Sequence, residues 1–173
     1  GGVALNCVSN GKLLRSGLFD DIWIQPAAGD AGGAIGCALF TWYQYLNNER
    51  VTSNKSDFMK GAYLGPEFKN RSVELFLSDN KYPYQTLVDG ELPEIIADLI
   101  ASEKVVGWFQ GRMEFGPRAL GARTIIGDAR SSKMQKMINL KIKYRESFRP
   151  FAPSVRAENI SDYFEIDRES PYM

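Results

Sequence analysis

Residues 91–127 read ELPEIIADLIASEKVVGWFQGRMEFGPRALGARTIIG, and this stretch decides the fold class. From Leu92, apolar residues recur at i, i+3, i+4, i+7 and i+8, which predicts an amphipathic helix over 91–103. Apolar and β-branched runs at 104–110 and 123–127 predict two strands, separated by a loop rich in Gly and Pro. A helix followed by strands is typical of an α/β protein.

The same pattern extends on both sides of this stretch. We expect further helices at 70–79 and 131–143, and strands at 84–88 and 151–155. Ser132 and Gln135 have the spacing of a capping box at the start of the later helix.

The N-terminal third has its own elements. An apolar segment at 3–8 is too short to be assigned to strand or helix from its pattern, and 21–25 predicts a strand that Pro26 closes. A long apolar run predicts a buried helix with Asp30 near its N-cap. The polar residues 51–62 are interpreted as a linker, which divides the chain into domains at 1–50 and 63–173.

Composition excludes several classes of protein. The chain has 173 residues, 44% hydrophobic and 24% charged, and no apolar run near the roughly 20 residues that span a bilayer. It has no histidine, so no Ser-His, Cys-His or His-metal site can come from this chain alone. Cys7 and Cys37 are expected to be buried free thiols in a reducing cytoplasm. We interpret the chain as part of a longer protein, because Gly1 replaces an initiator Met and Met173 follows the apparent start of a new segment.

A glycine-rich turn at 29–33 (GDAGG) precedes the first long helix. Free amides and the positive dipole of a helix N-terminus suit a phosphate, glycines allow close approach, and Asp30 could bind a cation. The other reading is structural, with Asp30 as a cap and the glycines as packing residues. Gly1 and Gly2 carry a weaker signal of the same kind.

Positive charge is concentrated between residues 112 and 149. This stretch has ten basic and three acidic residues, although the net charge of the whole chain is zero. Guanidinium forks and ammonium groups that converge would bind an acyl phosphate and stabilise charge as its bond to phosphate breaks. A solvated basic face is the alternative. Arg118 between glycines and Arg149 between aromatic residues and prolines favour binding over solvation.

Four blocks carry a family resemblance: GGVALNCVSNGKL, PAAGDAGGAIG, GRMEFGPRALGARTIIGDAR and LKIKYRESFRPFAPSV, at 1–13, 26–36, 111–130 and 140–155. In this order they resemble the O-carbamoyltransferases, which include nodulation enzymes and enzymes that decorate antibiotics. The resemblance implies the end of an actin/sugar-kinase-like (Kae1-like) domain followed by part of a YrdC-like α/β domain. It implies ATP-dependent transfer of carbamoyl from carbamoyl phosphate to a hydroxyl of a small-molecule acceptor, through carbamoyl adenylate.

The resemblance also implies roles for individual residues. Those that would hold carbamoyl phosphate are Arg118, Lys143 and Arg149, with Arg123 and Arg145 as weaker candidates. Those on the nucleotide side would be Gly1, Gly2, Asn6, Gly32 and Gly33. Asp30 matches a metal ligand, with iron expected and magnesium as the alternative. The histidine ligands of the family are absent from this chain, so we expect it neither to bind the metal tightly nor to turn over alone.

Two other functions are alternatives to this one. A hydrogenase-maturation carbamoyltransferase also joins YrdC-like and Kae1-like parts, but in the reverse order. A YrdC-like module that binds RNA would respond steeply to salt, because many phosphate contacts release many counterions. We expect a cytoplasmic enzyme that binds neither membrane nor nucleic acid.

Overall fold

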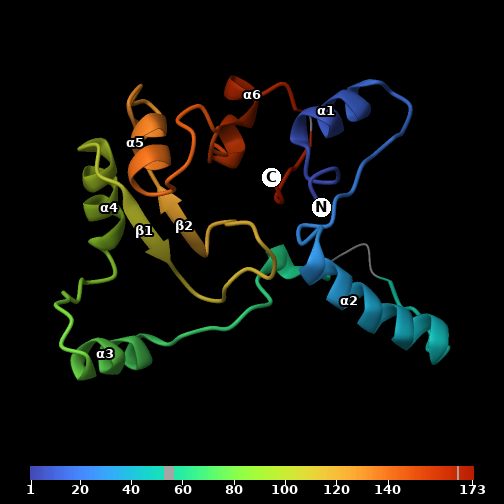
Figure 1. Cartoon of the computed structure of the whole chain (residues 1–173), viewed down its shortest axis with the longest axis horizontal. Helices are drawn as coiled ribbons and strands as arrows, with labels where there is room; N and C mark the ends of the chain where they lie inside the picture. The colour runs from blue at the N-terminus through green and yellow to red at the C-terminus, as the bar shows by residue number, and fades with distance from the viewer. Residues whose placement is uncertain (53–56, 167) are drawn as a thin grey trace. The chain divides into compact units, whose positions relative to one another are not determined.

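The computed structural model describes residues 1–52, 57–166 and 168–173 (Figure 1). They form two compact units, each built from segments that are separate in the sequence. Unit 1 contains Gly1–Glu67, Arg112–Ala122 and Ser170–Met173, and unit 2 contains Phe68–Gly111 and Arg123–Glu169.

A two-stranded antiparallel hairpin lies at the centre of unit 2. β1 (Val106–Phe109) pairs with β2 (Arg123–Ile126) in a register that sets Val106 opposite Ile126 and Phe109 opposite Arg123. Both strands were predicted, and both are slightly shorter than expected, with pairing limited to Val106–Phe109 and Arg123–Ile126. Helices and sheet together confirm the α/β class.

Helices of unit 2 precede and follow this hairpin in the sequence. The predicted helices appear as α3 (Asn70–Asp79), α4 (Leu92–Ala101) and α5 (Met134–Lys141), and α4 contacts β1 (Figure 1). Met134 and Ile138 of α5 are almost fully buried against Gly127, directly after β2. The segment that follows α5 ends in the 3-10 turn η3 (Ala157–Asn159) and the short α6 (Ile160–Tyr163).

The capping box predicted for α5 is wrong. Lys133 is the N-cap, and no side chain caps this end of the helix. Gln135 instead donates its side-chain amide to the carbonyl oxygens of Phe148 and Arg149, at 3.2 and 3.1 Å. The amide group is used to hold a later segment, so it is not available to the helix terminus.

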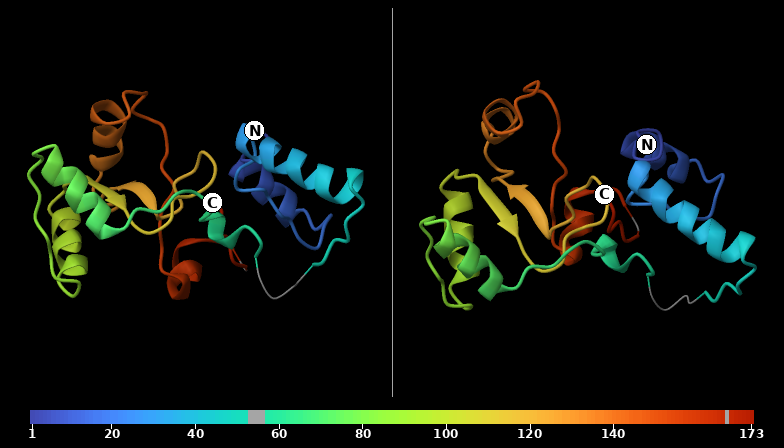
Figure 2. Two further views of the ribbon diagram at one scale, coloured as in Figure 1. Left: turned by 90° about the horizontal axis from the view of Figure 1, so that it is seen from below. Right: turned by 60° about the horizontal axis from the view of Figure 1, so that its bottom comes forward.

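Unit 1 contains two helices of different character. The undecided segment at 3–8 enters α1 (Cys7–Arg15), because the Asn6 side chain caps the helix by accepting from Ser9 N. α2 (Asp30–Phe40) continues into a π-helical turn, η1 (Thr41–Tyr45), as Figure 2 shows. α2 has no buried residue, so the expectation of a buried helix is wrong, and so is that of buried thiols at Cys7 and Cys37.

Three predicted strands, at 21–25, 84–88 and 151–155, are irregular in the structure. A strand needs a neighbour to satisfy its amides and carbonyls. Within the described part of the chain, β1 and β2 pair only with each other, so these apolar runs have no ladder to join.

Part of the predicted linker 51–62 is packed. Residues 53–56 lie outside the described residues, but the turn that follows, with η2 (Lys60–Ala62), buries Met59 and Ala62. The Asp57 carboxylate accepts from the amides of Met59 and Gly61, at 2.8 and 3.2 Å. The division into domains at 1–50 and 63–173 stays a prediction.

Gly127→Ala is expected to lower the free energy of unfolding by about 1–2 kcal/mol, because overpacked cores are strained. A Cβ at Gly127 would lie 2.8 Å from Ile138 Cδ1 and from two atoms of the Met134 side chain. Gly107→Ala on β1 is the matched control, since a Cβ there meets nothing within 4 Å. Urea unfolding measures both variants, and equal stabilities would contradict the packing described.

Asp128 is expected to make stability depend on pH in acid. The hydrogen bonds from the Arg130 side chain, at 2.8–3.2 Å, lower the pKa of Asp128 from 3.8 to about 2. A carboxylate with a depressed pKa stabilises the fold above its unfolded-state pKa, and the contribution is lost as pH falls from about 4 towards 2. Asp128→Asn should therefore be less stable than wild type at pH 6, with the difference narrowing below pH ~4.

Unfolding in urea at stepwise pH measures this difference. Arg130→Ala removes the main cause of the lowered pKa of Asp128. The free energy of unfolding of this variant should therefore change less with pH over the same interval. If the difference in free energy of unfolding between wild type and Asp128→Asn is the same from pH 6 to pH 2, Asp128 does not have this role.

Candidate functional site

The glycine-rich turn of unit 1 is closed by its own backbone. Pro26 and Ala27 are buried, and the Ala27 carbonyl oxygen accepts from Gly32 N at 2.9 Å. Gly33 N donates to the Gly29 carbonyl oxygen, also at 2.9 Å. Both amides already donate to backbone carbonyls, so they are not available to a phosphate. Gly32 and Gly33 can contribute to phosphate binding only by lacking side chains, which leaves room for the ligand to approach.

The two glycines differ in that space. A Cβ on Gly32 would run into the carbonyl oxygen of Ala27, so glycine is required there for the turn itself. A Cβ on Gly33 would meet nothing within 4 Å. Asp30, the first residue of α2, is exposed, and its side chain does not cap the helix.

The N-terminal residues form a turn before α1. The Gly1 carbonyl oxygen accepts from Leu5 N at 3.2 Å, and both Gly1 and Gly2 are exposed. Asn6 uses its side-chain oxygen to cap α1 at 3.1 Å. Asn6 therefore has a structural task in addition to the nucleotide role predicted for it.

The arginine loop, residues 111–122, is ordered by a buried carboxylate. Glu114 is 3% exposed, and its Oε1 accepts from Leu120 N at 2.7 Å and from Ala122 N at 2.8 Å. The Tyr63 hydroxyl donates to the Leu120 carbonyl oxygen at 2.8 Å. Phe115 N donates to the Ala62 carbonyl oxygen at 2.6 Å. These bonds fix both sides of the loop.

Arg118 lies at the exposed tip of this loop. Among the described residues, its guanidinium has no hydrogen bond or ion pair. The neighbouring Gly116 has φ +109°, and a Cβ on it would lie 2.9 Å from the Cβ of Ala27. Within unit 1 the arginine loop thus contacts Ala27, which lies two residues before the glycine-rich turn.

A second basic segment, residues 142–151 of unit 2, wraps over the end of α5. Asn139 is fully buried, and its side-chain amide donates to the carbonyl oxygens of Ser147 and Arg149 at 3.1 and 2.8 Å. Its Oδ1 accepts from Arg145 Nε at 2.7 Å. We call this segment the basic turn, and Asn139 is its anchor.

The predicted anion-binding residues of unit 2 differ in how they are engaged. Lys143 is exposed, and its ammonium has no ion pair with any described residue. Arg149 Nε donates to the Glu146 carboxylate at 3.1 Å. Arg145 is held by Asn139, and its guanidinium lies 4.9 Å from the ring centroid of Phe151. Arg123 is half-buried at the start of β2, opposite Phe109.

The carboxyl of Glu146 is paired with a cation and hydrogen-bonded to the backbone. A hydrogen bond from its own backbone amide, and then the Arg149 side chain, lower the pKa of the Glu146 carboxyl. Any anion that binds Arg149 must therefore compete with this carboxylate.

Two anchoring residues, Glu114 and Asn139, were not identified from the sequence. Each interrupts an apolar context, Glu114 between Met113 and Phe115 and Asn139 between Ile138 and Leu140. A polar residue in such a place is buried only if its hydrogen bonds are satisfied. A single polar residue within an apolar stretch is therefore the sequence signal that could have identified Glu114 and Asn139 as buried anchoring residues.

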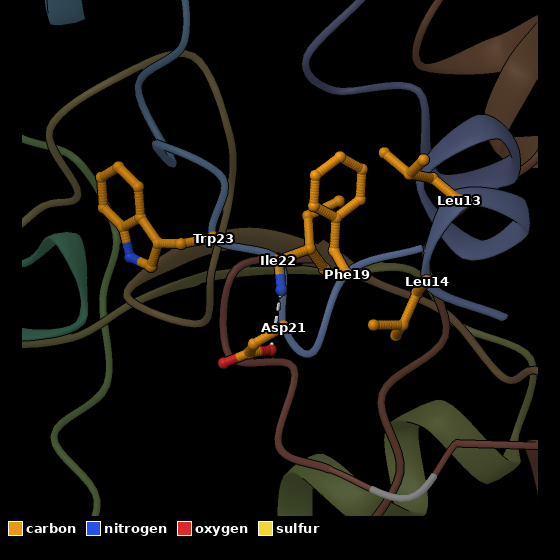
Figure 3. Close-up of a pocket in the computed structure, with 6 residues that line it drawn as sticks. All are labelled: Leu13, Leu14, Phe19, Asp21, Ile22 and Trp23. Carbon is orange, nitrogen blue, oxygen red and sulfur yellow. Dashed lines mark hydrogen bonds between the residues drawn. The ribbon is translucent and has the colours of Figure 1, made fainter. Parts of the chain in front are cut away.

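A shallow apolar pocket of about 250 Å³ lies in unit 1 between α1 and the segment that follows it (Figure 3). Phe19 and Ile22 face Leu13 and Leu14 of α1, while the Asp21 carboxylate points away and accepts from Ile22 N at 2.8 Å. None of the residues predicted to bind a ligand lines it.

No three His, Cys, Asp or Glu side chains gather closely enough to hold a metal in the described ranges 1–52, 57–166 and 168–173. Asp30 alone offers one carboxylate, which does not make a metal site. The helices within those ranges are too short or too polar to cross a bilayer.

Two family models match the chain in sequence order. Residues 1–39 match the carbamoyltransferase N-terminus, and residues 97–173 match the carbamoyltransferase C-terminus. The first match contains the glycine-rich turn, and the second contains the arginine loop and the basic turn.

Curated relatives match over the whole chain. It is 62% identical to a protein of uncharacterised function from Synechocystis, covering 28% of that protein. It is 44% identical to the nodulation protein NolO of Bradyrhizobium diazoefficiens, covering 31%, and 31% identical to the 3'-hydroxymethylcephem-O-carbamoyltransferase of Streptomyces clavuligerus, covering 30%. The chain thus spans about a third or less of the length of these relatives. With both family models in order and full-length coverage of this chain, the protein belongs to the carbamoyltransferase family.

Proposed function

We propose that the chain is part of an enzyme that transfers a carbamoyl group from carbamoyl phosphate to a hydroxyl of a small molecule, with ATP and through carbamoyl adenylate. In the first step the carbamoyl group exchanges its phosphate for AMP, with phosphate and pyrophosphate released and one water consumed. In the second step the acceptor oxygen bonds to the carbamoyl carbon and AMP leaves. The name of the Streptomyces relative, an O-carbamoyltransferase, supports the hydroxyl acceptor.

The observation that carries this proposal is the state of Arg118. An ordered loop presents its guanidinium to solvent, with no partner among the described residues, inside the segment that matches the family. A guanidinium that has no protein carboxylate is available to the paired oxygens of a phosphate. We assign Arg118 to the phosphate group of carbamoyl phosphate.

Lys143 and Arg149 are proposed to hold carbamoyl phosphate, with Arg123 and Arg145 as weaker candidates, on the family resemblance of the segments that carry them. Lys143 is free to act as a point charge, whereas Arg149 must exchange the Glu146 carboxylate for the anion. Arg145 is tied to Asn139 by Nε, which leaves its two terminal nitrogens for a ligand. These charges would stabilise the phosphate as it leaves.

The remaining assignments concern ATP, the metal and the domains. We assign ATP to Gly1, Gly2, Asn6, Gly32 and Gly33. Asp30 would supply one carboxylate to a metal, iron or magnesium, whose other ligands the described residues do not provide. Residues 1–50 are proposed as the end of a Kae1-like domain and 63–173 as part of a YrdC-like domain.

Arg118→Ala is expected to weaken the binding of carbamoyl phosphate by about 2 kcal/mol, the value of a hydrogen bond to a charged group. This corresponds to a roughly 30-fold rise in Kd. Isothermal titration calorimetry of carbamoyl phosphate into the full-length enzyme measures it.

Lys133→Ala, which removes an exposed charge at the start of α5, is the matched control and should leave Kd unchanged. An unchanged Kd for Arg118→Ala, with its melting temperature intact, would exclude Arg118 from the site. Absence of binding by the wild-type full-length enzyme, or RNA binding that falls steeply with salt, would instead favour a different function.

Gly33→Ala is expected to weaken ATP binding on the order of tenfold, because a methyl group would occupy the space proposed for a phosphate. The same change should raise the free energy of unfolding by up to about 1 kcal/mol, since alanine favours the helix. Gly36→Ala on α2 is the matched control, because a Cβ there also meets nothing within 4 Å. Equal ATP affinity of the two variants would remove Gly33 from the nucleotide site.

A further inference from the structure

We propose that Glu114 is a positioning residue, whose buried carboxylate closes the arginine loop and thereby fixes Arg118 for the phosphate of carbamoyl phosphate. This inference rests on the proposed function, because it names a residue that acts through Arg118. Glu114 itself faces the interior and has no contact with solvent beyond 3% of its surface.

The first step of the argument is the burial of a charge. Carboxylates are almost never fully buried unless they are paired or hydrogen-bonded. Glu114 meets this requirement with backbone amides, those of Leu120 and Ala122, at 2.7 and 2.8 Å from Oε1. One oxygen of Glu114 therefore closes the loop by binding backbone amides six and eight residues further along the chain.

The second step is what this closure encloses. Arg118 lies between Glu114 and the two amides that its carboxylate binds. Pro117 precedes it with a fixed φ, and Gly116 and Gly121 bend the chain at φ +109° and +111°. The tip cannot move far while both sides of the loop are held.

The third step is the freedom of the Arg118 side chain. With no bond of its own to any described residue, it is directed only by the backbone that carries it. Preorganised charge is the effective form of electrostatic stabilisation, since little reorganisation is needed when the anion arrives. Removing the Glu114 acceptor leaves two amides without their partner and frees the backbone beneath Arg118.

A double-mutant cycle tests the proposal, with Kd for carbamoyl phosphate measured by titration calorimetry. Glu114→Ala should raise Kd by about tenfold, in the middle of coupling energies for residues of one network. Glu114→Gln should raise it less, because its neutral oxygen is still an acceptor but a weaker one. In the Arg118→Ala background both substitutions should have no further effect.

Two further measurements separate positioning from general loss of structure. Hydrogen exchange should show the amides of Leu120 and Ala122 protected in wild type and faster in both Glu114 variants, with the amides of α5 unchanged. Glu103→Ala, an exposed carboxylate of unit 2, is the matched control and should alter neither exchange in the loop nor Kd.

The outcomes distinguish this inference from the proposed function. Suppose that wild type binds carbamoyl phosphate and that Arg118→Ala weakens this binding. If Glu114→Gln then changes Kd by the same factor with and without Arg118, or changes it in neither background, Glu114 is structural and the inference is overturned. If Glu114→Ala does not fold, the cycle with Glu114→Gln gives the answer alone. If wild type does not bind, the proposed function fails first.

Discussion

Irregular backbone that carries charge needs internal acceptors and donors, and this chain supplies them with two buried polar side chains. Glu114 accepts from two amides of the arginine loop, and Asn139 donates to two carbonyls of the basic turn. Each uses one short side chain to satisfy backbone groups that no strand or helix could reach. The exposed basic residues keep their places because these interior bonds hold the chain beneath them.

The arginines of this region differ in whether a carboxylate binds them. Arg130 is bound by Asp128 through two nitrogens, Arg112 by Glu67, and Arg149 by Glu146. Arg118 and Lys143 have no such partner in the described part of the chain. The surplus of positive charge in 112–149 is thus partly compensated by carboxylates.

The regular elements of unit 2 could be predicted from the sequence because their signals are local. The apolar spacing of α4 and the β-branched runs of β1 and β2 agree with the structure to within a few residues. The segments at 21–25, 84–88 and 151–155 failed for a non-local reason, since a strand exists only with a partner. The bonds of Glu114 and Asn139 join residues six to ten positions apart in irregular chain, and no periodic pattern announces them.

The helix α2 has a consequence for handling the protein. After Asp30 it carries only apolar residues and glycine, none of them buried, and Phe40 with Trp42 and Tyr45 of the adjoining η1 are 53–77% exposed. A helix of this kind is ordinarily covered by another apolar surface. Exposed apolar surface of this kind is an aggregation liability, so a rising protein concentration favours association of copies of this chain through α2 and η1.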